Sequence, residues 1–194
     1  DKPLGNTQII EVEGKRIALV GLLTQYIPRW ERSDHIKNMT FISAYDHLKH
    51  ELEQLKGQVD FVIAMYHGGM ERDLKTHVPT EKLTGENEGF ELTTLEGLDI
   101  LITGHQHRSF VESVNGVLVT QNTYRAQEFV TISLNLETRE ADAQIHQVSD
   151  YDIDHEFLSH FKTLQEKTQD WLDQEIGYLE DGNLFVEDGL QACI

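Results

Sequence analysis

The sequence predicts an α/β protein with α+β character, in which sheet packs on sheet and helices lie outside. Three apolar runs, 15–23, 60–66 and 99–103, are typical of buried strands. An amphipathic segment, 43–56, separates the first two runs and has helical spacing. Residues 110–147 instead alternate between apolar and polar side chains. The first part is therefore βαβ-like, and the second part is antiparallel.

The elements have recognisable ends. Ser43 is an expected N-cap, and Gly57 is expected to end the helix that follows it. Asn115-Gly116 favours a tight hairpin. The expected alternating strands are 110–114, 117–121, 129–136 and 141–147, and a short helix is expected at 90–96.

Two long segments lack a regular period. Residues 26–40 contain Pro28 and are predicted to form a loop. Residues 68–89 are polar and rich in turn formers, and a stretch of that length is usually functional or mobile. Further on, Asp154 is an expected cap of a long amphipathic helix that runs to about residue 176, and an acidic tail follows from Gly177. We therefore expect one folded part at 1–150, with a long helix and an acidic tail at 151–194.

Composition narrows the function classes. Apolar residues are 39% and charged residues 26% of the 194-residue chain, as in globular proteins, and no apolar run is long enough for a membrane span. The formal charge of −18 argues against binding a nucleic acid polymer, whereas bound cations can still attract a small phosphorylated substrate. Cys193 is the one cysteine, so neither an internal disulfide nor a thiolate cage is expected. Localisation, in the cytoplasm or outside the cell, stays open.

The tetrad Gly104-His105-Gln106-His107 directly follows an apolar run. In an extended segment, residues two apart project to one face, so both imidazoles are expected to reach one small region. Neutral imidazole is a common ligand of divalent metals. A bare His-x-His is more often a pair of exposed loop residues, but the buried strand before it and His67 at a second strand end favour a site at the strand ends.

His67 ends a second apolar run and is followed by Gly68 and Gly69. The paired glycines are expected to let the backbone approach an ion or a phosphate closely. Taken alone, this histidine is also consistent with a hydrogen-bonded core or rim residue. Together with the tetrad, it predicts a shared metal centre.

These residues resemble the second half of the calcineurin-like metallophosphoesterase domain. The segments AMYHGGMERDLKT (64–76), LTGENEGFEL (83–92) and DILITGHQHRS (99–109) are similar to the bacterial 5′-nucleotidase and 2′,3′-cyclic-nucleotide phosphodiesterase branch. The resemblance implies a four-layer αββα sandwich, of which this chain is the second half. It also implies that the long helix links to a C-terminal domain.

The resemblance implies roles for three histidines and two divalent ions, such as Zn²⁺ or Mn²⁺. His67 and His105 would bind one ion, and His107 would bind the other. In that family two ions activate a water, which attacks phosphorus in line. The substrate would be a small phosphorylated molecule, a nucleotide by the resemblance, with 5′-nucleotides, 2′,3′-cyclic nucleotides and nucleotide sugars all open.

Several family motifs are missing. The Asp-x-His, the Gly-Asp and the Gly-Asn-His motifs, which carry the bridging carboxylate and the catalytic histidine, are absent from this chain. We therefore expect no catalytic residue here, a need for the N-terminal half of the same domain, and no activity in the isolated piece. We also expect apolar sheet faces to be left open, so that the isolated piece self-associates.

Three further residues are candidates for contacts with the ligands or the substrate. Glu71 could orient His67, Arg108 could touch a phosphate, and Asn122 could approach the site from a strand end. A solvated charge or a surface salt bridge is the alternative for the first two. Two other functions stay open: a non-catalytic metal- or partner-binding remnant, and a mononuclear zinc hydrolase with three histidine ligands.

Overall fold

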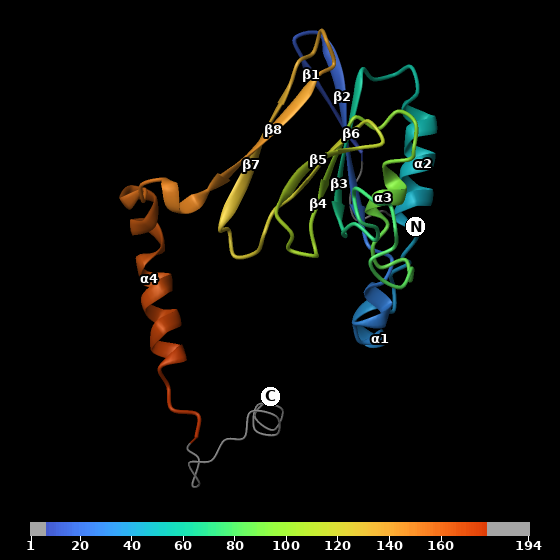
Figure 1. The fold of residues 1–194 in the computed structure, drawn as a ribbon. Coiled ribbons are helices and arrows are strands. Elements are labelled where there is room, and N and C mark those ends of the chain that lie inside the picture. Colours follow the sequence, from blue (N-terminus) through green and yellow to red (C-terminus); the bar gives the residue numbers. More distant parts are fainter. Residues whose placement is uncertain (1–6, 178–194) are drawn as a thin grey trace. The chain divides into compact units, whose positions relative to one another are not determined.

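The computed structural model describes residues 7–177, which divide into two units between Tyr151 and Asp152. The first unit contains a six-stranded sheet and a two-stranded sheet (Figure 1). The larger sheet has the order β1-β2-β3-β4-β6-β5, with strands β1 (Gln8–Val12), β2 (Lys15–Leu23), β3 (Phe61–His67), β4 (Ile100–Thr103), β5 (Phe110–Val114) and β6 (Val117–Gln121). The smaller sheet pairs β7 (Glu128–Leu134) with β8 (Ala141–Gln147).

Strands β2, β3, β4 and β6 are parallel, whereas β1 and β5 run antiparallel at the two edges. The register places Leu23 beside His67, Tyr66 beside Thr103, and Thr103 beside Gln121. The carboxyl ends of four parallel strands therefore meet at one edge of the sheet. In α/β folds this is the edge where ligands usually bind.

Helix α2 (Ala44–Leu55) covers one face of the large sheet, as predicted. The Ser43 hydroxyl accepts from Asp46 N–H and caps the helix. The Glu88 carboxylate adds to the cap, because it accepts hydrogen bonds from Ser43 Oγ at 2.7 Å and from Ala44 N at 2.9 Å. A residue 45 positions away thus fixes the start of α2.

The remaining helices of the first unit are short. They are η1 (Ile27–Arg29), α1 (Ser33–Ile36), α3 (Gly89–Leu92) and η2 (Val148–Asp150). Residues 26–40 are therefore only partly a loop. The helix predicted at 90–96 stops after one turn, because Thr93 and Thr94 donate their hydroxyls to the carbonyls of Phe90 and Glu91.

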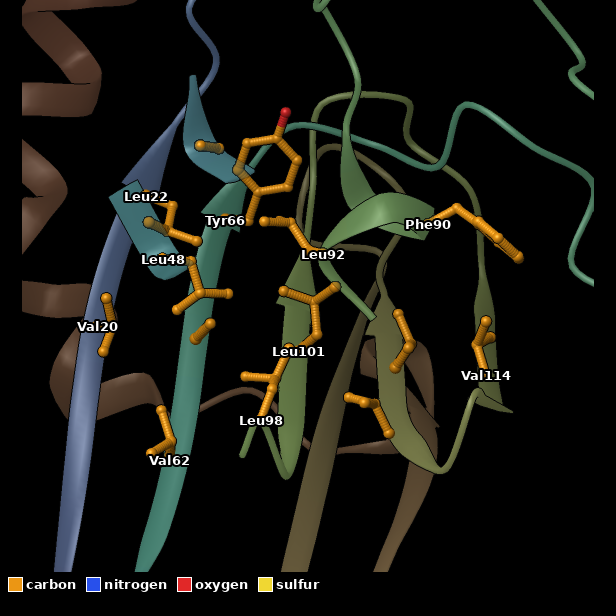
Figure 2. Close-up of a cluster of buried hydrophobic side chains, with 14 of the residues drawn as sticks. Val20, Leu22, Leu48, Val62, Tyr66, Phe90, Leu92, Leu98, Leu101 and Val114 are labelled. Carbon is orange, nitrogen blue, oxygen red and sulfur yellow. The ribbon is translucent and has the colours of Figure 1, made fainter. Parts of the chain in front are cut away.

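The core is formed where the helices pack on one face of the large sheet, the face that carries the even-numbered side chains of β2 and β3. Figure 2 shows Val20, Leu22, Val62 and Tyr66 on this face, with Leu48 of α2 among them. Leu48 and Val20 are fully buried. Burial of such side chains contributes roughly 1.5–3 kcal/mol each, so this layer holds the strand ends rigidly in place.

The opposite face of the sheet is only partly covered. The β7–β8 hairpin lies on this side (Figure 1), yet Leu23 and Met65 remain exposed. The prediction of buried strands holds for one face of β2 and β3, and the exposed Leu23 and Met65 agree with the expectation that apolar sheet faces are left open. Strand β1, whose Ile9 and Ile10 are also exposed, was missed because its pattern is short and irregular.

The predicted α/β class, with sheet on sheet and helices outside, is confirmed, and the arrangement is that of a partial domain. The second unit contains α4 (His155–Leu172), which Asp154 caps by accepting from Phe157 N–H, as expected. This helix ends four residues earlier than predicted. The expected acidic tail beyond Gly177, and Cys193 with it, lie outside the described residues. Across residues 7–177, none of the helices combines the length and apolar character needed to cross a bilayer.

Candidate active site

A loop follows each of the four parallel strands, and the three predicted histidines lie at the ends of two of these strands. His67 ends β3, and His105 and His107 lie in the loop after β4. All three line one hollow of about 410 Å³, to which Asn122 in the loop after β6 also contributes. The sheet thus brings together residues that lie up to 55 positions apart in the sequence.

The imidazoles of His67 and His105 are close neighbours. Their ring centroids are 5.6 Å apart, with the planes inclined at 58°. A zinc ion bonds imidazole nitrogen at about 2.0–2.1 Å, so one ion between these two rings fits that separation. His107 lines the same hollow, but its ring contacts Tyr124 rather than either of the other histidines, at 5.3 Å between centroids.

The tetrad is not extended, so the geometric reason given for its convergence is wrong. His105 and His107 both have left-handed backbones, with φ of 67° and 56°. Residues other than glycine adopt the left-handed region at a cost of order 1 kcal/mol, and such backbone strain concentrates at functional sites. A tight loop, rather than strand alternation, directs the two rings.

Gln106 holds this loop against the loop after β3. Its Oε1 accepts from Met70 N at 2.9 Å, and its Nε2 donates to Met70 O at 3.1 Å. Glu81 extends the connection, because its carboxylate accepts from Gln106 Nε2 at 3.4 Å and from Asn87 Nδ2 at 2.9 Å. Asn87 in turn accepts from Gly69 N at 2.6 Å. The residue between the two histidines therefore fixes their distance from His67.

Gly68 and Gly69 are needed for contacts within the protein. A Cβ on Gly68 would lie 2.1 Å from Cζ of Tyr66, and a Cβ on Gly69 would lie 2.2 Å from Cδ of Gln106. Such distances are far below van der Waals contact, so neither position has space for a side chain. The glycines make room for Tyr66 and Gln106, which gives them a role besides the expected approach to an ion.

Two buried side chains anchor the other end of the tetrad loop and the loop after β6. Gln121 accepts from Arg108 N at 2.9 Å and donates to Thr103 Oγ1 at 2.9 Å. Glu128 accepts from Thr123 N and from Ser109 Oγ, each at 2.9 Å. Partial burial acts to raise the pKa of Glu128, but these hydrogen bonds and one from Gln147 outweigh it, so the pKa lies below its ordinary value.

The loop after β6 adds polar groups to the hollow. Asn122 lines it, together with Thr123, Tyr124 and Arg125. The hydroxyl of Thr123 is buried without a hydrogen-bond partner among the described residues. Arg125 lies over the Tyr124 ring at 5.3 Å and forms no ion pair within residues 7–177. An unpaired guanidinium beside three imidazoles suits an anionic ligand.

The other two candidates are placed differently. Both carboxylate oxygens of Glu71 accept from α3 backbone groups, Phe90 N at 2.9 Å and Glu91 N at 3.0 Å, so they are engaged there rather than with His67. Burial raises the pKa of Glu71, against the effect of these hydrogen bonds. Arg108 contributes its backbone N–H to Gln121, and its side chain is not among those that line the hollow.

Two contacts of His105 were not predicted. Glu86 places Oε1 3.0 Å from His105 Nε2, and the Trp30 ring stacks on the imidazole with centroids 5.2 Å apart. Both residues lie in the loops 26–40 and 68–89, whose sequences carry no period. The sequence signal for a functional role of these residues was the length of the two segments without a regular period.

Between residues 7 and 177, no three His, Cys, Asp or Glu side chains surround a single point closely enough to hold an ion. The three-histidine zinc site considered from the sequence would therefore require His107 to move towards the other two rings. The geometry instead offers a pair, His67 and His105, and a separate His107.

Two solved structures are similar in fold to most of this chain. A putative 5′-nucleotidase from Staphylococcus aureus superposes on 96% of the chain with a TM-score of 0.78 and 33% sequence identity. The sulfate thiohydrolase SoxB from Thermus thermophilus matches 84% of the chain with a TM-score of 0.68, and at 16% identity it shows the fold alone.

The chain belongs to the 5′-nucleotidase family of calcineurin-like metallophosphoesterases. The chain spans 37% of the staphylococcal chain and 29% of SoxB. Two curated proteins are also similar to the chain: endonuclease YhcR of Bacillus subtilis is 23% identical over 96% of the chain, and cell wall protein Lmo0130 of Listeria monocytogenes is 22% identical over 68%. The chain spans only 16% and 18% of these two relatives. No family model matches the sequence.

Proposed function

We propose that the chain forms part of an enzyme that hydrolyses phosphate esters of nucleotides. The observation that carries this proposal is the gathering of His67, His105 and His107 in one hollow at four parallel strand ends. The staphylococcal relative, a putative 5′-nucleotidase, supports nucleotides as the substrate class.

In this proposal His67 and His105 hold one divalent ion, and His107 holds a second ion, Zn²⁺ or Mn²⁺. The separation of 5.6 Å between the first two rings fits a shared ion. When bound, two such ions supply the positive charge that polarises a phosphoryl group and acidifies water. Because this chain lacks the family's Asp-x-His, Gly-Asp and Gly-Asn-His motifs, the other ligands and the catalytic histidine would come from the N-terminal half.

The chain's own residues would orient the substrate. The Arg125 guanidinium would donate charged hydrogen bonds to a phosphate oxygen, and Asn122 and Thr123, which line the same hollow, offer neutral donors. Arg125 and Ala126 both have left-handed backbones in the turn that presents the guanidinium, at φ of 60° and 51°. This turn therefore carries backbone strain next to the hollow that Arg125 lines.

The N-terminal half would cover the open side of the sheet. Leu23 and Met65 are exposed on the face that carries His67, and each is about two-fifths exposed. Apolar side chains at such positions are stabilised by burial against another layer. The same docking would bring the missing ligands to the histidine cluster. The segment 151–194 would then serve as the link towards a C-terminal domain, as the resemblance implies.

The test uses the complete enzyme, with the chain joined to its N-terminal half. Hydrolysis of 5′-nucleotides, 2′,3′-cyclic nucleotides and nucleotide sugars is measured with added Mn²⁺. His67→Ala and His105→Ala should lower kcat/KM by about 100-fold or more, the scale of a lost electrostatic stabiliser. His50→Ala, an exposed histidine on α2, is the matched control. Full activity in the two site variants, or turnover by the 194-residue chain alone, would refute the proposal.

A further inference from the structure

Of the three histidines predicted to bind metal, His105 makes the shortest side-chain hydrogen bond, and its partner is Glu86. Its Oε1 lies 3.0 Å from Nε2 of His105, and the two side chains are 32% and 24% exposed. The contact is therefore partly shielded from water. The two residues come from different loops, so the fold, rather than local sequence, brings them together.

The segment that carries Glu86 is fixed on both sides. The Glu86 carbonyl accepts from Thr24 Oγ1 at 2.7 Å and from the Tyr66 hydroxyl at 3.3 Å. The next two residues, Asn87 and Glu88, are buried and bond to the backbone of Gly69 and to the start of α2. The Glu86 carboxylate therefore extends from an anchored backbone segment rather than from a free loop.

The His105 ring is restrained as well. Its backbone is left-handed, and the Trp30 indole stacks on one of its faces with an interplanar angle of 29°. No other hydrogen bond to this ring is present in the described part of the chain. Nε2 is therefore engaged, and Nδ1 is the ring nitrogen left for another partner.

The contact has a chemical consequence. A neutral imidazole carries one N–H and one lone pair, and an ionised carboxylate can only accept. A hydrogen bond between them places the proton on Nε2 and the lone pair on Nδ1. Carboxylates in this position fix the tautomer and orientation of metal-binding histidines and raise their basicity.

We propose that Glu86 is a positioning residue, which selects the Nε2–H tautomer of His105 and directs Nδ1 towards the ion. The part of this inference that concerns the ion rests on the proposed function. The tautomer does not, because it is a property of the chain before any metal binds.

The first test is long-range ¹H–¹⁵N NMR of the histidine-labelled chain at about pH 8, where histidine is ordinarily neutral. The wild-type chain should show His105 as the Nε2–H tautomer. Glu86→Gln should keep this tautomer, because the amide oxygen still accepts, whereas Glu86→Ala should lower its share to that of a free neutral imidazole. Glu81→Ala loosens the same loop without touching His105 and should leave the tautomer unchanged. An Nδ1–H tautomer in the wild type, or no change in Glu86→Ala, overturns the proposal.

The second test measures affinity for Mn²⁺ in the complete enzyme. Glu86→Ala should weaken binding by about 10–100-fold, and Glu86→Gln should recover part of the loss. Unchanged affinity in Glu86→Ala overturns the role of Glu86 towards the ion. If the complete enzyme binds no metal while the tautomer behaves as expected, the proposed function fails and the positioning of His105 stands. If metal binds but the tautomer does not respond, only this inference fails.

Discussion

Replacement of Gln106 should destabilise the chain out of proportion to the size of the side chain removed. Its amide makes two hydrogen bonds to the backbone of Met70, a residue with no exposed surface. Each net hydrogen bond contributes about 0.5–1.5 kcal/mol, and a buried backbone group left without a partner costs about 1–3 kcal/mol. With two such groups affected, Gln106→Ala should lower the free energy of unfolding by about 2–4 kcal/mol.

The nature of the replacement decides where in this range the loss falls. Alanine leaves space through which water can reach the N–H and the carbonyl of Met70, so its cost should lie at the lower end. Methionine is similar in size to glutamine but cannot form either hydrogen bond. Gln106→Met should therefore keep the Met70 groups dry and unpaired, and cost at least as much as Gln106→Ala.

The assay is urea unfolding of the chain, followed by far-UV circular dichroism, with Gln144→Ala as the control. Gln144 is exposed on β8, where substitutions usually change stability by less than about 0.5 kcal/mol. Equal midpoints for Gln106→Ala and Gln144→Ala, or a stable Gln106→Met chain, would show that Gln106 does not hold the two loops together.

Two further outcomes follow from the same site. Gly68→Ala should cost more than about 2 kcal/mol in thermal unfolding, since the new Cβ would overlap the buried Tyr66 ring; unchanged stability would show that the ring has room to move. Glu128→Gln should lower the unfolding free energy by about 1–2 kcal/mol at neutral pH. Because the folded-state pKa of Glu128 is lowered, its contribution is present above the ordinary carboxyl pKa of about 4.3 and is lost as the pH falls through the folded value. The difference from wild type should shrink over that window, and a difference independent of pH would contradict this.

The sequence was sufficient for the class of fold and for most of the elements. Apolar runs and caps such as Ser43 and Asp154 are local signals, because the side chain bonds to a backbone group three residues away. The apolar runs of β2 and β3 did not themselves distinguish a covered face from an open one, and the open face was expected only from the missing family motifs. Burial on that face depends on which layer covers it, and a strand's own sequence does not record whether the covering layer is present.

The candidate site was predicted in part. The grouping of His67 with the tetrad followed from strand ends, and the shared hollow agrees with that expectation, while their role as ligands stays a prediction. The contacts that fix the loops could not be found in the same way. Gln106 with Met70, and Glu86 with His105, join positions 36 and 19 residues apart through side-chain hydrogen bonds that have no sequence period. Only the tertiary structure specifies such pairs.

The most direct test of the proposed centre is anomalous diffraction from crystals of the complete enzyme grown with Mn²⁺. The account predicts two anomalous peaks about 3.5–4 Å apart, one between the rings of His67 and His105 and the other beside His107. A map with no peak against these rings, or with one ion bound by all three histidines, would contradict it.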